Sequence, residues 1–129
     1  MGISNLHLFV GWLAMLLGAA SGAVMGLFFH REGWAGGYAA LRRRMLRLGH
    51  ISFFGIGLLN FFFALTLSLV EFPTTNVRIA SAGFLVAVIT MPLTCFLTAW
   101  KESFRHLFFI PVLAVLIGIL PILFGWPLS

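Results

Sequence analysis

Residues 41–70 read LRRRMLRLGHISFFGIGLLNFFFALTLSLV. Arginines crowd the start of this stretch, and from Leu48 to Val70 the chain is largely apolar and has no charged residue. A bilayer core of about 30 Å is crossed by about 20 apolar residues in a helix, because lipid offers the backbone no other hydrogen-bond partner. The stretch therefore predicts a membrane-spanning helix with a basic segment at its first end.

The rest of the chain has the same character. Of its 129 residues, 61% are hydrophobic and 9% are charged, and the mean hydropathy is +1.10. Soluble domains have about 25% charged residues. The chain has three Glu and no Asp, which leaves few carboxylates for hydrolytic dyads or hard-metal sites. The single cysteine, Cys95, excludes an internal disulfide and gives no zinc or iron–sulfur signature.

Four apolar stretches are long enough to cross a bilayer, at residues 6–29, 48–70, 79–100 and 107–126. They predict an all-α, polytopic integral membrane protein, a four-transmembrane-helix bundle that forms one domain over residues 1–129. No Lys or Arg precedes Arg31, so we expect the first stretch to be a span and not a secretory signal peptide.

The basic residues predict the orientation of these spans. Short loops rich in Lys and Arg favour the cytoplasmic side. The second loop carries only Arg78, whereas the first carries Arg31, Arg42, Arg43, Arg44 and Arg47, and the third carries Lys101 and Arg105. We therefore expect loops one and three in the cytoplasm and both termini outside, in a bacterial inner membrane.

Within the first loop, Leu41, Met45 and Leu48 are spaced as one face of a helix, and arginines occupy the other faces. This pattern predicts an interfacial helix whose arginines contact anionic lipid headgroups. Since a basic segment beside a membrane already has an anionic partner, nucleic acid is not an expected partner.

Small residues mark the helix faces expected to pack together. Close approach in lipid favours glycine, alanine and serine. Two successive GxxxG steps occur in the first span, and the expected packing residues are Gly11, Gly18, Gly22 and Gly26, with Gly57 in the second span. His7 lies on the glycine face, so we expect it to point toward protein. Asn60 is expected to bond across helices, because an unpartnered amide is costly in hydrocarbon.

Three histidines form the constellation with the most chemical promise. His30, His50 and His106 all fall near the expected cytoplasmic boundary. Neutral imidazole ligates haem iron, so the three are candidate axial ligands of a haem b, with His50 and His106 as the preferred pair. Either haem propionates or lipid headgroups would pair with Arg43, Arg44, Arg47 and Arg105. The alternative is that these histidines simply rest at the boundary and bind no ligand.

Three functions remain open at this level. The first is a small subunit of a membrane redox complex for electron transfer, with one haem b or beside a subunit that has one. The second is a cofactor-free scaffold or assembly subunit that contacts other membrane proteins or a second copy. The third is an oligomeric pore or carrier, with Thr94 and Thr98 along the path. No catalytic residue is predicted, and catalysis by the chain on its own is not expected.

Overall fold

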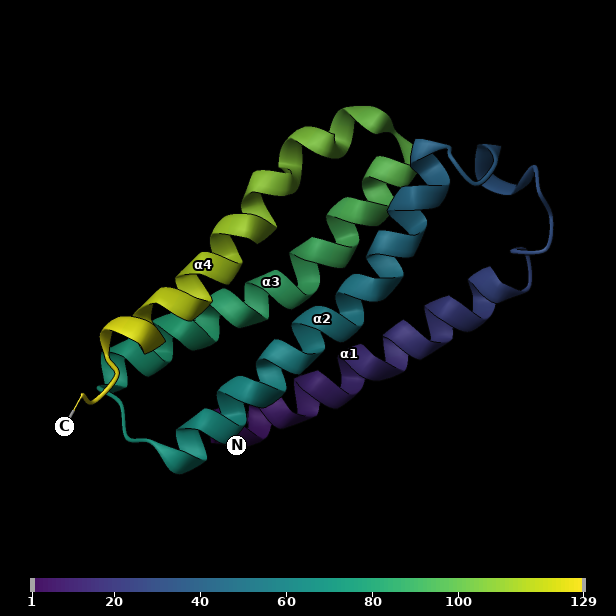
Figure 1. The fold of residues 1–129 in the computed structure, drawn as a ribbon. Helices are drawn as coiled ribbons and strands as arrows, with labels where there is room; N and C mark the ends of the chain where they lie inside the picture. Colours follow the sequence, from purple (N-terminus) through teal and green to yellow (C-terminus); the bar gives the residue numbers. More distant parts are fainter. Residues whose placement is uncertain (1, 129) are drawn as a thin grey trace.

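The computed structural model describes residues 2–128 and contains four long helices (Figure 1). They are α1 (Ile3–Gly26), α2 (Leu41–Leu69), α3 (Thr74–Trp100) and α4 (Phe109–Phe124), with short 3₁₀ helices η1 (Trp34–Gly36) and η2 (Glu102–Phe108) in the connections. By length and composition, α1, α2, α3 and the η2–α4 segment can each cross a membrane. The expectation of an all-helical chain with four membrane-length helices is confirmed.

The long helices lie side by side in chain order (Figure 1). α1 packs on α2, α2 on α3 and α3 on α4, whereas α1 and α3 touch only sparsely. Both termini and the α2–α3 connection lie at one end of the molecule, and the other two connections lie at the opposite end. The first and third loops therefore share an end, as their basic residues predict.

The basic segment of the first loop differs from the expectation. It forms the first turns of α2, which begins at Leu41 and not at residue 48. Residues 41–48 contain neither proline nor glycine, so nothing interrupts the propagation of the helix. The predicted separate interfacial helix is therefore part of α2.

Prolines account for two of the other boundaries. α3 begins at Thr74, earlier than residue 79, with Pro73 at its N-cap; proline suits the start of a helix because no donor is needed there. Pro111 lacks the N–H that would reach the Leu107 carbonyl, and the chain takes the tighter 3₁₀ form of η2 up to Phe108. At the first helix no proline is involved: α1 spans Ile3–Gly26, three residues earlier at each end than the expected span of residues 6–29.

The core lies among α2, α3 and α4. One buried cluster joins Ile56, Ala87 and Ala114, and another joins Phe63, Ala80 and Phe84. Between them, α3 and α4 meet backbone to backbone at Gly83 and Gly118. A β-carbon on Gly83 would lie 2.7 Å from the Ala114 carbonyl oxygen and 2.8 Å from the Gly118 Cα. Only glycine fits at that crossing.

Candidate functional site

A cluster of three polar side chains joins α1, α2 and α3 toward the end that carries the termini. His7 Nδ1 lies 2.6 Å from Asn60 Oδ1, and His7 Nε2 lies 2.8 Å from Ser81 Oγ. His7 and Asn60 are fully buried, and Ser81 is 7% exposed. The His7 and Phe63 rings also meet in a T-shaped contact, with the ring centres 4.6 Å apart. Each of the three helices contributes one residue, so the cluster ties all three together.

The hydrogen bonds of this cluster form a chain in which Ser81 donates to His7, His7 donates to Asn60, and Asn60 donates to a backbone carbonyl. Asn60 Nδ2 donates to the Ile56 carbonyl at 2.8 Å, which makes Asn60 Oδ1 the acceptor for His7 Nδ1–H. In the neutral imidazole, Nε2 then accepts the proton of the Ser81 hydroxyl. A buried polar group without a partner is costly in hydrocarbon, and none of the cluster's side-chain atoms in the described chain is left without one.

The order serine, histidine, asparagine resembles that of a nucleophile, a base and an orienting group. The surroundings do not suit catalysis, because Ser81 is nearly buried and none of the three residues lines a described cavity. The arrangement therefore fixes the register of three helices. The inward position of His7 and the cross-helix bond of Asn60 are confirmed.

Ser81 is not among the residues singled out in the sequence analysis. The signal that could have found Ser81 is its position along the third span, at about the same distance from the termini-bearing end as His7. His7 and Ser81 stand near the starts of α1 and α3, and these two helix ends lie at the same end of the molecule (Figure 1). Matching the polar residues of spans that start on one side would have brought the two together.

His50 lies between α1 and α2. Its Nδ1–H donates to the Gly18 carbonyl at 2.7 Å, and the Ser21 hydroxyl donates to the same oxygen at 3.0 Å. The ring rests against Gly22, where a β-carbon would overlap it. His50 Nε2 has no hydrogen-bond partner among residues 2–128. The ring is thus oriented by a backbone carbonyl, with one nitrogen left over.

The other two candidate ligands lie elsewhere. His30 is exposed in the turns after α1, and His106 is exposed in η2. His50 packs on α1, whereas His106 belongs to the connection between α3 and α4. Among the described residues, no side chain forms a hydrogen bond or ring contact with both rings. Residues 2–128 contain no group of three or more His, Cys, Asp or Glu that would hold a metal ion. The haem pair stays a prediction.

Arg43 has a structural role in the first connection. Its side chain is only 3% exposed, and its terminal nitrogens donate to the carbonyls of Phe29, Glu32 and Arg31 at 2.9, 3.3 and 3.4 Å. The guanidinium carbon also lies 4.6, 5.5 and 5.6 Å from the ring centres of Phe29, Tyr38 and Trp34. A cation over aromatic faces is attracted by the ring quadrupole. Arg43 therefore folds the connection around itself and is not free to meet a headgroup or a propionate.

The other predicted basic residues are more accessible. Arg44 is exposed and Arg47 is half-buried, with its guanidinium carbon 4.2 Å from the centre of the Tyr38 ring. Arg105 pairs with Glu102 at 3.0 Å, both side chains being exposed. An exposed pair of this kind contributes little to stability.

Replacing Arg43 by glutamine should destabilise the chain by about 2 kcal/mol, because the carbonyl bonds and the aromatic contacts are lost together. The midpoint of unfolding in detergent micelles measures this effect. Arg44→Gln is the matched control, since Arg44 is exposed on the same helix turn and its side chain forms no hydrogen bond within the described chain. Equal shifts for the two variants would contradict the role given to Arg43.

Four of the five predicted packing glycines lie at the contact between α1 and α2. A β-carbon on Gly11 would lie 2.8 Å from the Phe61 ring, one on Gly18 2.7 Å from the Phe54 ring, and one on Gly57 3.1 Å from the Ala14 β-carbon. Gly22 faces His50, and Gly26 has no atom within 4 Å of a β-carbon. The GxxxG step from Gly18 to Gly22 thus holds α1 to α2.

The threonines expected along a pore are buried in the structure. Thr94 is 4% and Thr98 is 3% exposed, and the Thr98 hydroxyl donates to the Thr94 carbonyl at 2.7 Å. Neither lines a described cavity. The Thr98 hydroxyl therefore bonds within its own helix and does not face a cavity.

Comparison of the chain with known protein families, with curated proteins and with solved structures finds no match.

Proposed function

We propose that the chain is a small multi-pass membrane subunit that stabilises a larger membrane assembly and carries no cofactor of its own. One observation supports this most directly: the polar groups buried between its helices are used to hold those helices. Besides the buried His7–Asn60–Ser81 cluster, two bonds nearer the surface join neighbouring helices. The half-buried Asn76 donates from Nδ2 to the Pro121 carbonyl at 2.8 Å, and the exposed Arg42 donates from Nε to the Ala99 carbonyl at 3.0 Å. In lipid, such bonds fix how helices pack. Few polar groups remain for a substrate.

The exposed surface supports a membrane location. Large apolar side chains are exposed along the outer helices, for example Trp12 at 67% and Leu16 at 64% on α1 and Leu113 at 50% on α4. A contiguous apolar surface of this kind marks contact with lipid or with another protein. We place the chain in a bacterial inner membrane, with the end formed by the first and third connections in the cytoplasm.

Thiol labelling tests this orientation. Ala39 and Thr75 are exposed at opposite ends of the molecule, and the native Cys95 is buried. In intact cells whose outer membrane is permeabilised, a membrane-impermeant maleimide should modify Thr75→Cys and not Ala39→Cys. In inside-out vesicles the pattern should reverse. Labelling of Ala39→Cys alone in the cells would overturn the orientation.

The scaffold role is tested by extracting the tagged chain from its native membrane into polymer nanodiscs. We expect one or more other membrane proteins to be extracted at fixed stoichiometry with the 14.2-kDa chain. These proteins should be absent from a control extraction of an unrelated tagged multi-pass protein. Native mass spectrometry reads the stoichiometry. A chain that leaves the membrane only as a free 14.2-kDa monomer would contradict the proposal.

A redox subunit is the second candidate, and the orientation of His50 favours it. Haem- and metal-binding histidines commonly donate one ring N–H to a carbonyl, which fixes the tautomer and leaves the other nitrogen as the ligand. His50 has this arrangement, with Nδ1–H on the Gly18 carbonyl. Since His30 and His106 are exposed and no described cavity is lined by a histidine, a partner subunit would have to supply the second ligand and the walls. An absorption spectrum of the nanodisc sample decides: without a Soret band this candidate fails.

A further inference from the structure

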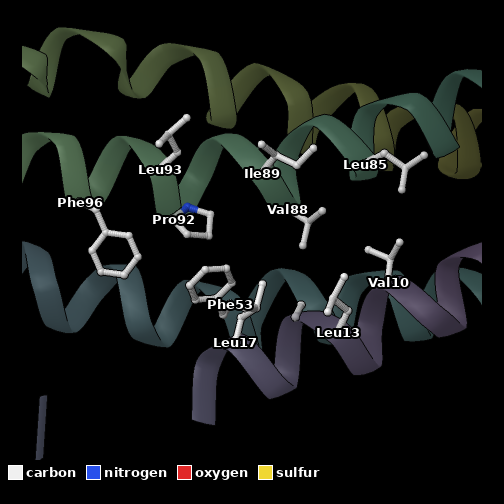
Figure 2. Close-up of a pocket in the computed structure, with 11 residues that line it drawn as sticks. Val10, Leu13, Leu17, Phe53, Leu85, Val88, Ile89, Pro92, Leu93 and Phe96 are labelled. Atoms are coloured by element: carbon white, nitrogen blue, oxygen red, sulfur yellow. The ribbon is translucent and has the colours of Figure 1, made fainter. Parts of the chain in front are cut away.

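Two apolar cavities lie along the side of the molecule where α1 and α3 barely touch. One has a volume of about 580 Å³ and the other about 460 Å³. They share Leu17, Phe53 and Phe96 in their walls, so they adjoin, and we name the two together the α1–α3 groove. Figure 2 shows Val10 and Leu13 of α1 across the larger cavity from Val88 of α3. Each volume falls in the range of about 300–1,000 Å³ that is typical of ligand-binding cavities.

Cations flank the end of this groove nearest η1. Phe28 and Trp34 line that end, and the Arg31 guanidinium carbon lies 5.7 Å from the centre of the Phe28 ring. On the α3 side, Arg42 is held by its bond to the Ala99 carbonyl, about one helical turn beyond Phe96 in the groove wall. Thus Arg31 lies beside the α1 side of the groove and Arg42 beside the α3 side.

These two arginines have no anionic partner within the described chain. Both are exposed, and the one ion pair among residues 2–128 joins Arg105 to Glu102. The Arg42 bond to Ala99 uses Nε alone, which leaves its terminal nitrogens as donors. Arginine donors of this kind bind phosphate strongly.

We propose that the α1–α3 groove is a binding site for an anionic phospholipid, with the phosphate at Arg31 and Arg42 and an acyl chain along the apolar walls. This inference rests on the proposed membrane location and not on the scaffold role. Charge complementarity selects this occupant. An apolar helix of a partner would fill the walls but leave both guanidinium groups without an anion, whereas an anionic lipid matches the apolar walls and the basic mouth together.

Two variants test the two halves of the site, each with a matched control. Ala20 lines the groove and is exposed, so Ala20→Trp should fill it; Ala19→Trp adds the same ring at the next exposed position, which lines no described cavity. The double variant Arg31→Gln/Arg42→Gln removes the charges at the mouth. Its control is Arg78→Gln, an exposed arginine at the other end of the molecule.

Binding is measured on the purified full chain in non-ionic detergent by native mass spectrometry, with phosphatidylglycerol or phosphatidylcholine of identical acyl chains as the probe. We expect phosphatidylglycerol to bind on the order of tenfold more tightly. Ala20→Trp and the double arginine variant should each lower its binding by a similar factor, while both controls bind like the original chain. Circular dichroism and the unfolding midpoint verify that each variant is folded.

Several results would overturn the proposal. The first is that the two lipids bind equally well. The second is that phosphatidylglycerol binding stays unchanged both in folded Ala20→Trp and in the folded double variant. A further one is a change in oligomeric mass with Ala20→Trp while lipid binding stays the same, since the occupant would then be a second copy of the chain. Because the measurement uses the isolated chain, it can fail while the nanodisc experiment on the assembly succeeds, and the reverse also holds.

Discussion

Replacing Gly83 by leucine should lower the free energy of unfolding by about 3 kcal/mol, near the upper end of the range for overpacked interiors. The atoms that a β-carbon would meet belong to the backbone of α4 at Ala114 and Gly118, and a backbone cannot rotate away as a flexible side chain does. The two helices must separate, and the buried surface between them is lost. Unfolding in mixed micelles, followed by tryptophan fluorescence, measures the change.

Gly55→Leu is the control for this experiment. Gly55 is an exposed glycine in the middle of α2, and a β-carbon there meets nothing within 4 Å. The same substitution should change the free energy of unfolding by no more than about 0.5 kcal/mol. If Gly83→Leu were equally harmless, the close crossing of α3 and α4 would not exist.

Replacing His7 by leucine should cost about 2 kcal/mol, because the variant loses two hydrogen bonds and leaves the Asn60 amide oxygen buried without a donor. Ser81→Ala removes one bond and should cost about 1 kcal/mol at most. The double variant His7→Leu/Asn60→Leu should be less destabilised than the sum of its single variants, because the Asn60 amide is then no longer buried without its histidine donor. Additive costs in the same unfolding assay would argue against a coupled cluster.

The sequence predicts the number of long helices and the shared end of the two basic loops, because both depend on coarse properties. A run of about 20 apolar residues is readable from composition, and antiparallel neighbours return loops one and three to the same end. The start of α2 was less predictable. The change from charged to apolar residues shows that the apolar run begins at Leu48. The helix itself begins at Leu41, because its backbone hydrogen bonds extend through the arginine-rich residues as well.

The direction of each histidine was also beyond the sequence. A helix that is apolar on nearly all sides gives little sign of its rotation, and rotation decides what a side chain faces. The His50 ring fits where Gly22 has no β-carbon and the Gly18 carbonyl accepts its proton. That fit depends on how α1 and α2 align, so the sequence indicates a common level for His50 and His106 but not a common site.

The GxxxG steps show a related limit. Such a motif indicates where a helix can approach another closely, but it does not say whether the neighbour belongs to the same chain. In this structure Gly18 lies on Phe54 and Gly22 on His50, both in α2. Substitutions at these two positions would therefore disturb the fold of the chain before they disturbed any assembly.

The unbroken course of α2 has a mechanical consequence. Its 29 residues make a rod of about 44 Å at 1.5 Å per residue, which exceeds a hydrocarbon thickness of about 30 Å. In the proposed membrane location the helix would lean, or its arginine-bearing end would project beyond the acyl chains. A thinner bilayer would increase the projection and a thicker one would reduce it, so the height of the guanidinium groups above the leaflet would report the local thickness of the membrane.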